Sequence, residues 1–135
     1  MSDRAREKQL SAVMIVVGLI FLVGIYPMTL IWPSGWVWHD GGQSNYFQLI
    51  VGVYATLGVF LLVGARKPME NLSLVWFTVW SSIVHAGIMA VQAINGGAHD
   101  RGHLYGDVPA LLIVAILFTL VTPRRTTVPS APVRV

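Results

Sequence analysis

One histidine lies deep inside a long apolar segment of the sequence. His85 stands about nine residues before the end of the apolar run 72–94, which is roughly 13 Å along a helix. On a helix its own face would also carry Thr78, Ser81, Met89 and Gln92. Ionisable groups inside a membrane span are costly and usually face the protein interior. The stripe therefore indicates either a proton-relay or ligand-binding group in a cavity, or a neutral imidazole that hydrogen-bonds to Ser81 or to another helix.

A second polar cluster follows this segment. His99, His103 and Asp107 are spaced four residues apart, next to Asp100, so on a continuous helix two imidazoles and one carboxylate would share a face. Such nitrogen and oxygen ligands suit zinc or copper. His39 could add a third imidazole from another loop. Glycines argue against a continuous helix here: Gly96, Gly97, Gly102 and Gly106. Because loop histidines are usually solvated, we predict no metal site here. His99, His103 and Asp107 stay only as candidate ligands.

Asp107 allows two interpretations. It could cap a helix that begins at Val108, with Pro109 in the first turn. If the helix begins nearer Leu104, the carboxylate lies one turn inside the membrane and needs a polar partner, which His85 or Gln92 could supply. The second interpretation predicts one polar cavity lined by Ser81, His85, Gln92, His103 and Asp107.

The composition identifies the elements that must position these residues. The chain has 135 residues, of which 55% are hydrophobic and only 11% charged, against about 25% charged in an ordinary soluble domain. Four apolar runs lack Lys, Arg and Glu and are about long enough to cross a bilayer: 10–32, 46–65, 72–94 and 104–122. We expect an all-α bundle of four transmembrane helices in one domain, 1–122, followed by a disordered tail, 123–135. Pro27 is expected to kink or end the first helix.

The basic residues predict the orientation of the bundle. Eight lie on one side: Arg4, Arg6, Lys8, Arg66, Lys67, Arg124, Arg125 and Arg134. Only Arg101 lies on the other. By the positive-inside rule, both termini face the cytoplasm. Interface-seeking aromatic rings are expected at the outer surface: Trp32, Trp36, Trp38, Tyr46 and Tyr105.

Small residues on the runs predict close helix packing. On the third run Ser82, Ala86 and Ala90 recur every four residues, which lets backbones approach in lipid. Similar notches occur elsewhere: Gly18, Gly24, Gly52, Gly58 and Ala110. The partners implied are the lipid bilayer and, through these faces, another helix of this chain, a second copy or another membrane protein.

Several function classes are not favoured. The basic residues form no stripe of the kind that binds nucleic acid, and without cysteine there is no thiolate chemistry. The first run lacks the membrane-embedded carboxylate that small proton-driven cation exporters share. Ser81 and His85 lie one helical turn apart, but no third catalytic group accompanies them. We therefore predict no cofactor and no catalytic residue.

Two stretches carry a family resemblance. Residues 80–85, Trp-Ser-Ser-Ile-Val-His, and 101–110, Arg-Gly-His-Leu-Tyr-Gly-Asp-Val-Pro-Ala, resemble an uncharacterised family of small bacterial four-span membrane proteins. The resemblance implies a four-helix protein of the bacterial inner membrane and assigns no activity. We expect a non-enzymatic accessory, interaction or lipid-associated component. The alternative is a metal-binding protein, or a small-solute or proton transporter, that uses a polar cavity near the outer face.

Overall fold

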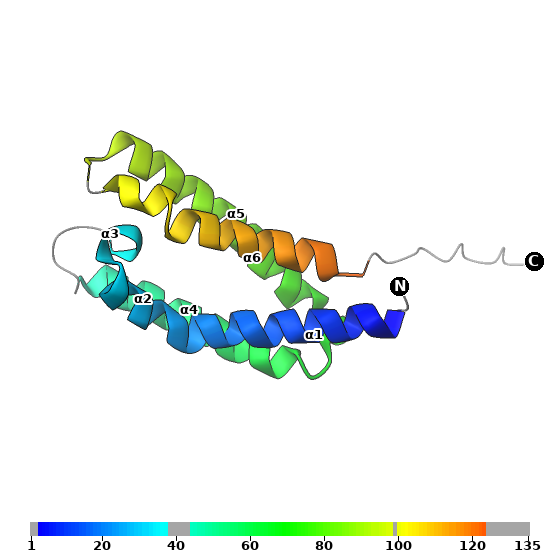
Figure 1. Ribbon diagram of the computed structural model, residues 1–135. Coiled ribbons are helices and arrows are strands. Elements are labelled where there is room, and N and C mark those ends of the chain that lie inside the picture. Colours follow the sequence, from blue (N-terminus) through cyan, green and yellow to red (C-terminus); the bar gives the residue numbers. More distant parts are fainter. Residues whose placement is uncertain (1–2, 38–43, 99, 124–135) are drawn as a thin grey trace, which may run out of the picture.

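The computed structural model describes residues 3–37, 44–98 and 100–123, and every regular element within them is a helix (Figure 1). The helices are α1 Asp3–Leu19, α2 Ile25–Ile31, α3 Pro33–Trp36, α4 Asn45–Gly64, α5 Leu72–Asn95 and α6 Asp107–Val121, with a π-helical turn Ile20–Gly24 and 3₁₀ helices Pro68–Asn71 and Asp100–Leu104. Four helical stretches are long and apolar enough to cross a membrane: Arg4–Ile31, Asn45–Gly64, Pro68–Asn95 and Asp100–Val121. The predicted all-α architecture with four long apolar helices is confirmed.

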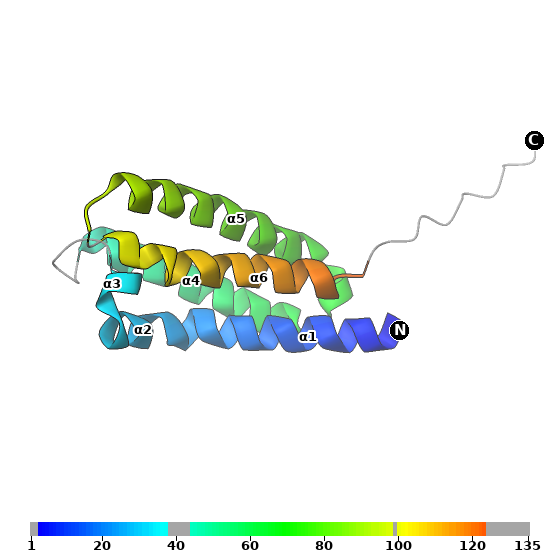
Figure 2. The same cartoon turned by 45° about the horizontal axis from the view of Figure 1, so that its top comes forward.

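The long helices form two pairs. α1 packs along α4, and α5 packs along α6 (Figures 1 and 2). α1 also contacts α6, whereas α4 and α5 barely contact each other. At one end, here called the α3 end, α3 packs against the 3₁₀ helix Asp100–Leu104. At the opposite end, here called the N-terminal end, α1 begins and α6 finishes (Figure 1).

The main hydrophobic core lies between the pairs toward the N-terminal end. Four buried residues of the first helix recur at helical spacing, Leu10, Met14, Val17 and Phe21, and therefore share one face. The other helices supply the rest of the cluster: Leu61, Ala65, Val75, Val79, Ala115 and Phe118. Because α1, α4, α5 and α6 all contribute, this core ties the two pairs together.

Glycines bring α1 and α4 into backbone contact. A Cβ atom at Gly58 would lie 2.6 Å from the Gly18 carbonyl oxygen and 2.8 Å from the Leu22 backbone nitrogen. A Cβ atom at Gly52 would meet nothing within 4 Å, and one at Gly24 would meet only Ile20 of the same helical stretch. Gly18 and Gly58, two of the predicted small-residue positions, therefore form one contact between two helices of the same chain.

The small residues of α5 face α6. Ser82 and Ala86 are buried, and Ala90 is half-buried. Ala86 belongs to a second apolar cluster, with Met89 of α5 and two residues of α6, Val108 and Leu111. Close approach along this stripe explains why α5 and α6 form the tightest pair.

Pro27 does not end the first helix. The helix continues to Ile31, and the irregularity is the π-helical turn Ile20–Gly24. A proline ring clashes with the carbonyl four residues earlier, here that of Val23, which lies inside this turn. The wider turn accommodates the clash without breaking the helix. At the other end of this helix, α1 begins at Asp3, ahead of the apolar run 10–32.

Replacing Gly58 by alanine should separate α1 from α4. We expect Gly58→Ala to lower the free energy of unfolding by about 1–3 kcal/mol, because backbone atoms occupy the space of the new methyl group. Gly52→Ala, on the same helix, should leave it unchanged or raise it by up to about 1 kcal/mol. SDS titration in detergent micelles, followed by helical circular dichroism, measures both. Equal effects of the two substitutions would contradict the contact.

Candidate functional site

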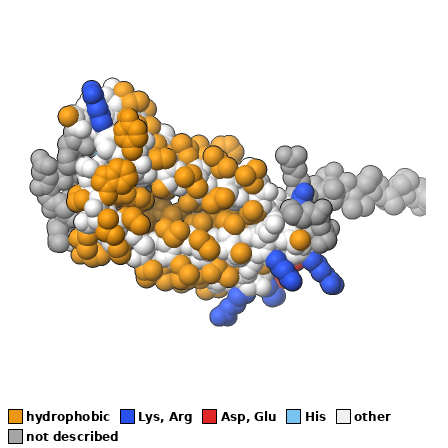
Figure 3. All heavy atoms as spheres, viewed as in Figure 1, with side chains coloured by type: hydrophobic (Ala, Val, Ile, Leu, Met, Phe, Trp, Pro, Cys, Tyr) orange, Lys and Arg blue, Asp and Glu red, His pale blue; other side chains and the backbone are white. Residues whose placement is uncertain are grey.

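A cavity of about 1230 Å³ separates the two helix pairs; we call it the cleft. Its walls are mostly apolar side chains of α1, α4, α5 and α6, and a hollow is visible among the apolar side chains in Figure 3. Four isoleucines of its lining are exposed: Ile20, Ile50 of α4, Ile88 of α5 and Ile113 of α6. The cleft is therefore reached from the sides of the bundle.

A close backbone contact joins the helix pairs at the α3 end. A Cβ atom at Gly102 would overlap the carbonyl oxygen of Ser34, and one at Gly106 would overlap that of Gly35. Any other residue at these two positions would push α3 away from the start of α6. The cleft is thus bounded by this contact at one end and by the hydrophobic core at the other.

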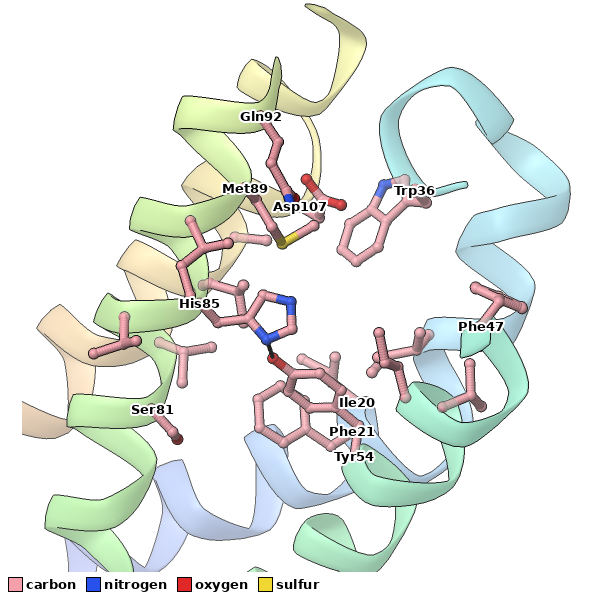
Figure 4. A pocket seen from close by; sticks show the side chains of 18 of the residues that line it. Ile20, Phe21, Trp36, Phe47, Tyr54, Ser81, His85, Met89, Gln92 and Asp107 are labelled. Carbon is pink, nitrogen blue, oxygen red and sulfur yellow. Dashed lines mark hydrogen bonds between the residues drawn. The ribbon is translucent and has the colours of Figure 1, made fainter. Parts of the chain in front are cut away.

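His85 projects from α5 into the cleft and meets a tyrosine of α4 (Figure 4). The Tyr54 hydroxyl and His85 Nδ1 are 3.1 Å apart, and the ring centroids are 5.7 Å apart. Phe21 packs edge-on against Tyr54, with ring centroids 4.9 Å apart. The Ser81 hydroxyl donates instead to the Thr78 carbonyl of its own helix. The hydrogen-bond partner of His85 is therefore on another helix.

Tyr54 was not among the residues predicted from the sequence, although its position along α4 carries a signal. Tyrosine in membrane proteins favours the interface, yet Tyr54 stands nine residues after the first residue of α4, Asn45, roughly 14 Å along the helix. His85 stands ten residues before the last residue of α5, Asn95, roughly 15 Å along that helix. Two polar rings at one depth on successive antiparallel helices are candidates for a contact.

Asp107 and His103 form a buried pair at the α3 end. His103 Nδ1 lies 2.7 Å from Asp107 Oδ2, and the side chains are 0% and 9% exposed. α6 begins at Asp107 itself, with Gly106 in the N-cap position. Asp107 is therefore not the N-cap residue that one interpretation of the sequence required. The pair ties the 3₁₀ helix Asp100–Leu104 to the first turn of α6.

Four of the five predicted cavity residues line the same cleft. They are Ser81, His85, Gln92 and Asp107. His103 is fully buried and is paired with Asp107. In Figure 4, Gln92 and Asp107 lie toward the α3 end of the cleft, beyond His85, and face Trp36. Their shared location is a structural fact, and a function for them stays a prediction.

Trp36 differs from the other aromatic residues expected at the outer surface. Trp32, Tyr46 and Tyr105 are exposed, as interfacial side chains would be. Trp36 is half-buried and lines the cleft (Figure 4). Trp38 lies outside the described residues. Trp36, although expected at the outer surface, therefore forms part of the cleft wall.

The candidate metal ligands are only partly described. Across 3–37, 44–98 and 100–123, no three His, Asp or Glu side chains come close enough together to hold a metal ion. Asp100 Oδ2 accepts a hydrogen bond from the Gly97 backbone nitrogen. His39 and His99 lie outside the described residues. The described lining of the cleft combines apolar walls and aromatic rings with polar side chains, among them His85, Gln92 and the carboxylate of Asp107.

Comparison with known proteins gives one match. A family model, DUF6632, described as a family of unknown function, matches residues 5–133. The match covers all of α4, α5 and α6, all but the first two residues of α1, and every residue that lines the cleft. No curated protein and no solved structure matches the chain.

Proposed function

The chain belongs to DUF6632, a family of unknown function, and we propose that it is a non-enzymatic, lipid-associated membrane protein whose cleft holds an apolar chain taken from the bilayer. One observation carries the proposal. The apolar cleft of about 1230 Å³ opens sideways between helices that are themselves apolar enough to lie in lipid. Pockets for drug-sized ligands are typically about 300–1,000 Å³, so the cleft has room for a long flexible chain.

The outer surface supports membrane insertion. Apolar side chains cover the length of the bundle, and the basic side chains stand at its ends (Figure 3). Soluble monomers rarely expose continuous apolar patches larger than about 300–600 Å². Each of the four long helices carries exposed large apolar side chains. A hydrocarbon environment would remove the cost of exposing them to water.

The charges support an orientation. Arg4 and Lys8 lie in the first turns of α1 and Arg66 follows the end of α4, so all three belong to the N-terminal end. Arg101 lies in the 3₁₀ helix that packs against α3. Under the positive-inside rule, the N-terminal end faces the cytoplasm and the α3 end faces outward. Both chain termini would then be cytoplasmic. The sequence resemblance implies that the membrane is the inner membrane of a bacterium.

The absence of native cysteine makes this orientation directly measurable. We expect a membrane-impermeant maleimide to label Tyr105→Cys in intact spheroplasts and to label Glu70→Cys only after the membrane is opened. Both native side chains are exposed, Tyr105 near the α3 end and Glu70 near the N-terminal end. The opposite pattern would reverse the proposed orientation, and equal labelling of both in intact spheroplasts would contradict the four-span topology.

A bulky side chain in the cleft should expel its occupant. Ile88→Trp fills the cleft wall, whereas Val91→Trp adds the same ring to an exposed position of α5 that does not line the cleft. We expect native mass spectra of the detergent-purified wild type and Val91→Trp to retain a bound lipid. Ile88→Trp should retain about tenfold less lipid, because losing contacts worth about 1.4 kcal/mol weakens binding by that factor.

Equal retention by Ile88→Trp and Val91→Trp would locate the lipid elsewhere and overturn the proposal. The same spectra address the alternative of a metal-binding or transport protein at the outer face. That alternative is favoured by the polar side chains of Gln92 and Asp107 toward the α3 end of the cleft. A metal adduct without bound lipid would support it.

A further inference from the structure

We propose that the preferred occupant of the cleft is a lipid-soluble quinone, whose ring carbonyl accepts a hydrogen bond from His85 in the middle of the bilayer. This inference rests on the proposed lipid-binding function and deepens it. A cleft that holds any apolar chain needs no polar group. The Tyr54–His85 pair places a polar group on the cleft wall, and its chemistry selects among lipids.

The Tyr54–His85 hydrogen bond fixes which nitrogen carries the imidazole proton. Among the residues that the structure describes, it is the one hydrogen bond of the Tyr54 hydroxyl. An O–H group without an acceptor is costly in an apolar environment. The phenol therefore donates to His85 Nδ1, and a neutral imidazole then carries its proton on Nε2.

This proton faces the cleft. In Figure 4, the second ring nitrogen of His85 points away from Tyr54 into the space between the helix pairs. No hydrogen bond to another side chain in the described part of the chain occupies that nitrogen. The cleft thus contains a positioned N–H donor, and a ligand satisfies it with a hydrogen-bond acceptor such as a carbonyl oxygen.

The depth of His85 restricts the kind of acceptor. α5 has 24 residues, or about 36 Å, against a hydrocarbon thickness of about 30 Å. His85, about 15 Å from the α3 end of this helix, lies near the middle of the hydrocarbon layer. A charged carboxylate or phosphate is costly there. Phospholipid headgroups and their ester carbonyls stay at the interface, so the acceptor belongs to an uncharged lipid that resides within the layer.

Aromatic rings around the donor favour a flat ligand. Phe21 and Tyr54 pack edge to face at 4.9 Å, and both line the cleft with Trp36. Aromatic walls favour stacked or edge-on contact with another ring. Ile50 and Ile88 line the cleft and are exposed on α4 and α5, two helices that barely contact each other, so an apolar tail could leave the cleft between them for the bilayer. An uncharged ring with carbonyl oxygens and a long apolar tail is the structure of a lipid-soluble quinone.

The test compares two probes of similar shape in the delipidated protein. Decylubiquinone carries ring carbonyls, and dodecylbenzene has a ring and tail without them. Native mass spectra over a series of probe concentrations give the affinity of each. In the wild type we expect decylubiquinone to bind about tenfold more tightly, the upper range for one net hydrogen bond. In His85→Phe this preference should vanish while dodecylbenzene binding is unchanged, whereas misfolding would weaken both probes.

Further variants keep the test decisive if His85→Phe does not fold. His85→Gln retains an N–H donor and should retain the preference. Tyr54→Phe removes the hydroxyl that fixes the tautomer and should reduce the preference. Thr56→Val is the control, because its hydroxyl bonds to the Gly52 carbonyl on an exposed position of α4 outside the cleft.

The outcomes separate this inference from the proposed function. Equal binding of both probes, unchanged in His85→Phe or Tyr54→Phe, would overturn the quinone inference and leave lipid binding in place. Binding of neither probe, together with no bound lipid in the untreated protein, would overturn both. A preference for decylubiquinone that depends on His85 and Tyr54 would establish the donor site.

Discussion

The two helix pairs meet at both ends of the bundle and part between them, and every other feature of the site depends on this arrangement. At the N-terminal end, a core built from all four long helices fixes the separation of the pairs. At the α3 end, Gly102 and Gly106 let the backbone of the 3₁₀ helix and the turn before α6 touch α3 directly. A single continuous core would have filled the space with side chains. Because the pairs pack together mainly at their ends, a cleft remains between them.

The polar side chains in and beside the cleft form two hydrogen-bonded pairs with different roles. His103 and Asp107 are buried together and join neighbouring segments of the chain. Such a pair holds the α3 end in place through a short hydrogen bond. Tyr54 and His85 instead join the two helix pairs across the cleft, where α4 and α5 otherwise hardly touch. A hydrogen bond there stabilises the gap between the helices and presents the remaining imidazole nitrogen to an occupant.

Much of the fold could be predicted from the sequence, because long apolar runs and small-residue spacing act locally along each helix. The sequence also predicted one polar cavity with five members; the structure places four of them around one cleft and buries the fifth, His103, beside Asp107. A function for these residues stays a prediction. Contacts between distant segments could not be predicted this way. The approach of Gly102 and Gly106 to α3 and the partnership of Tyr54 with His85 depend on how the helices are arranged in space. The π-helical turn before Pro27 could not be predicted either. The proline was expected to kink or end the helix, whereas the helix widens over one turn and continues.

Collision rates of a spin label on the cleft wall test the central claim, that the cleft is open to the hydrocarbon of the bilayer. The cysteine-free chain permits Ser81→Cys, which faces the cleft, and Ser82→Cys, which is buried on the same helix. After nitroxide labelling and reconstitution into vesicles, we expect molecular oxygen to reach the Ser81 position far more often than Ser82, and a water-soluble nickel relaxant to reach neither. Low oxygen access at both positions would show a closed bundle. High nickel access at Ser81 would show a water-filled cavity, and either result would contradict a lipid-binding cleft.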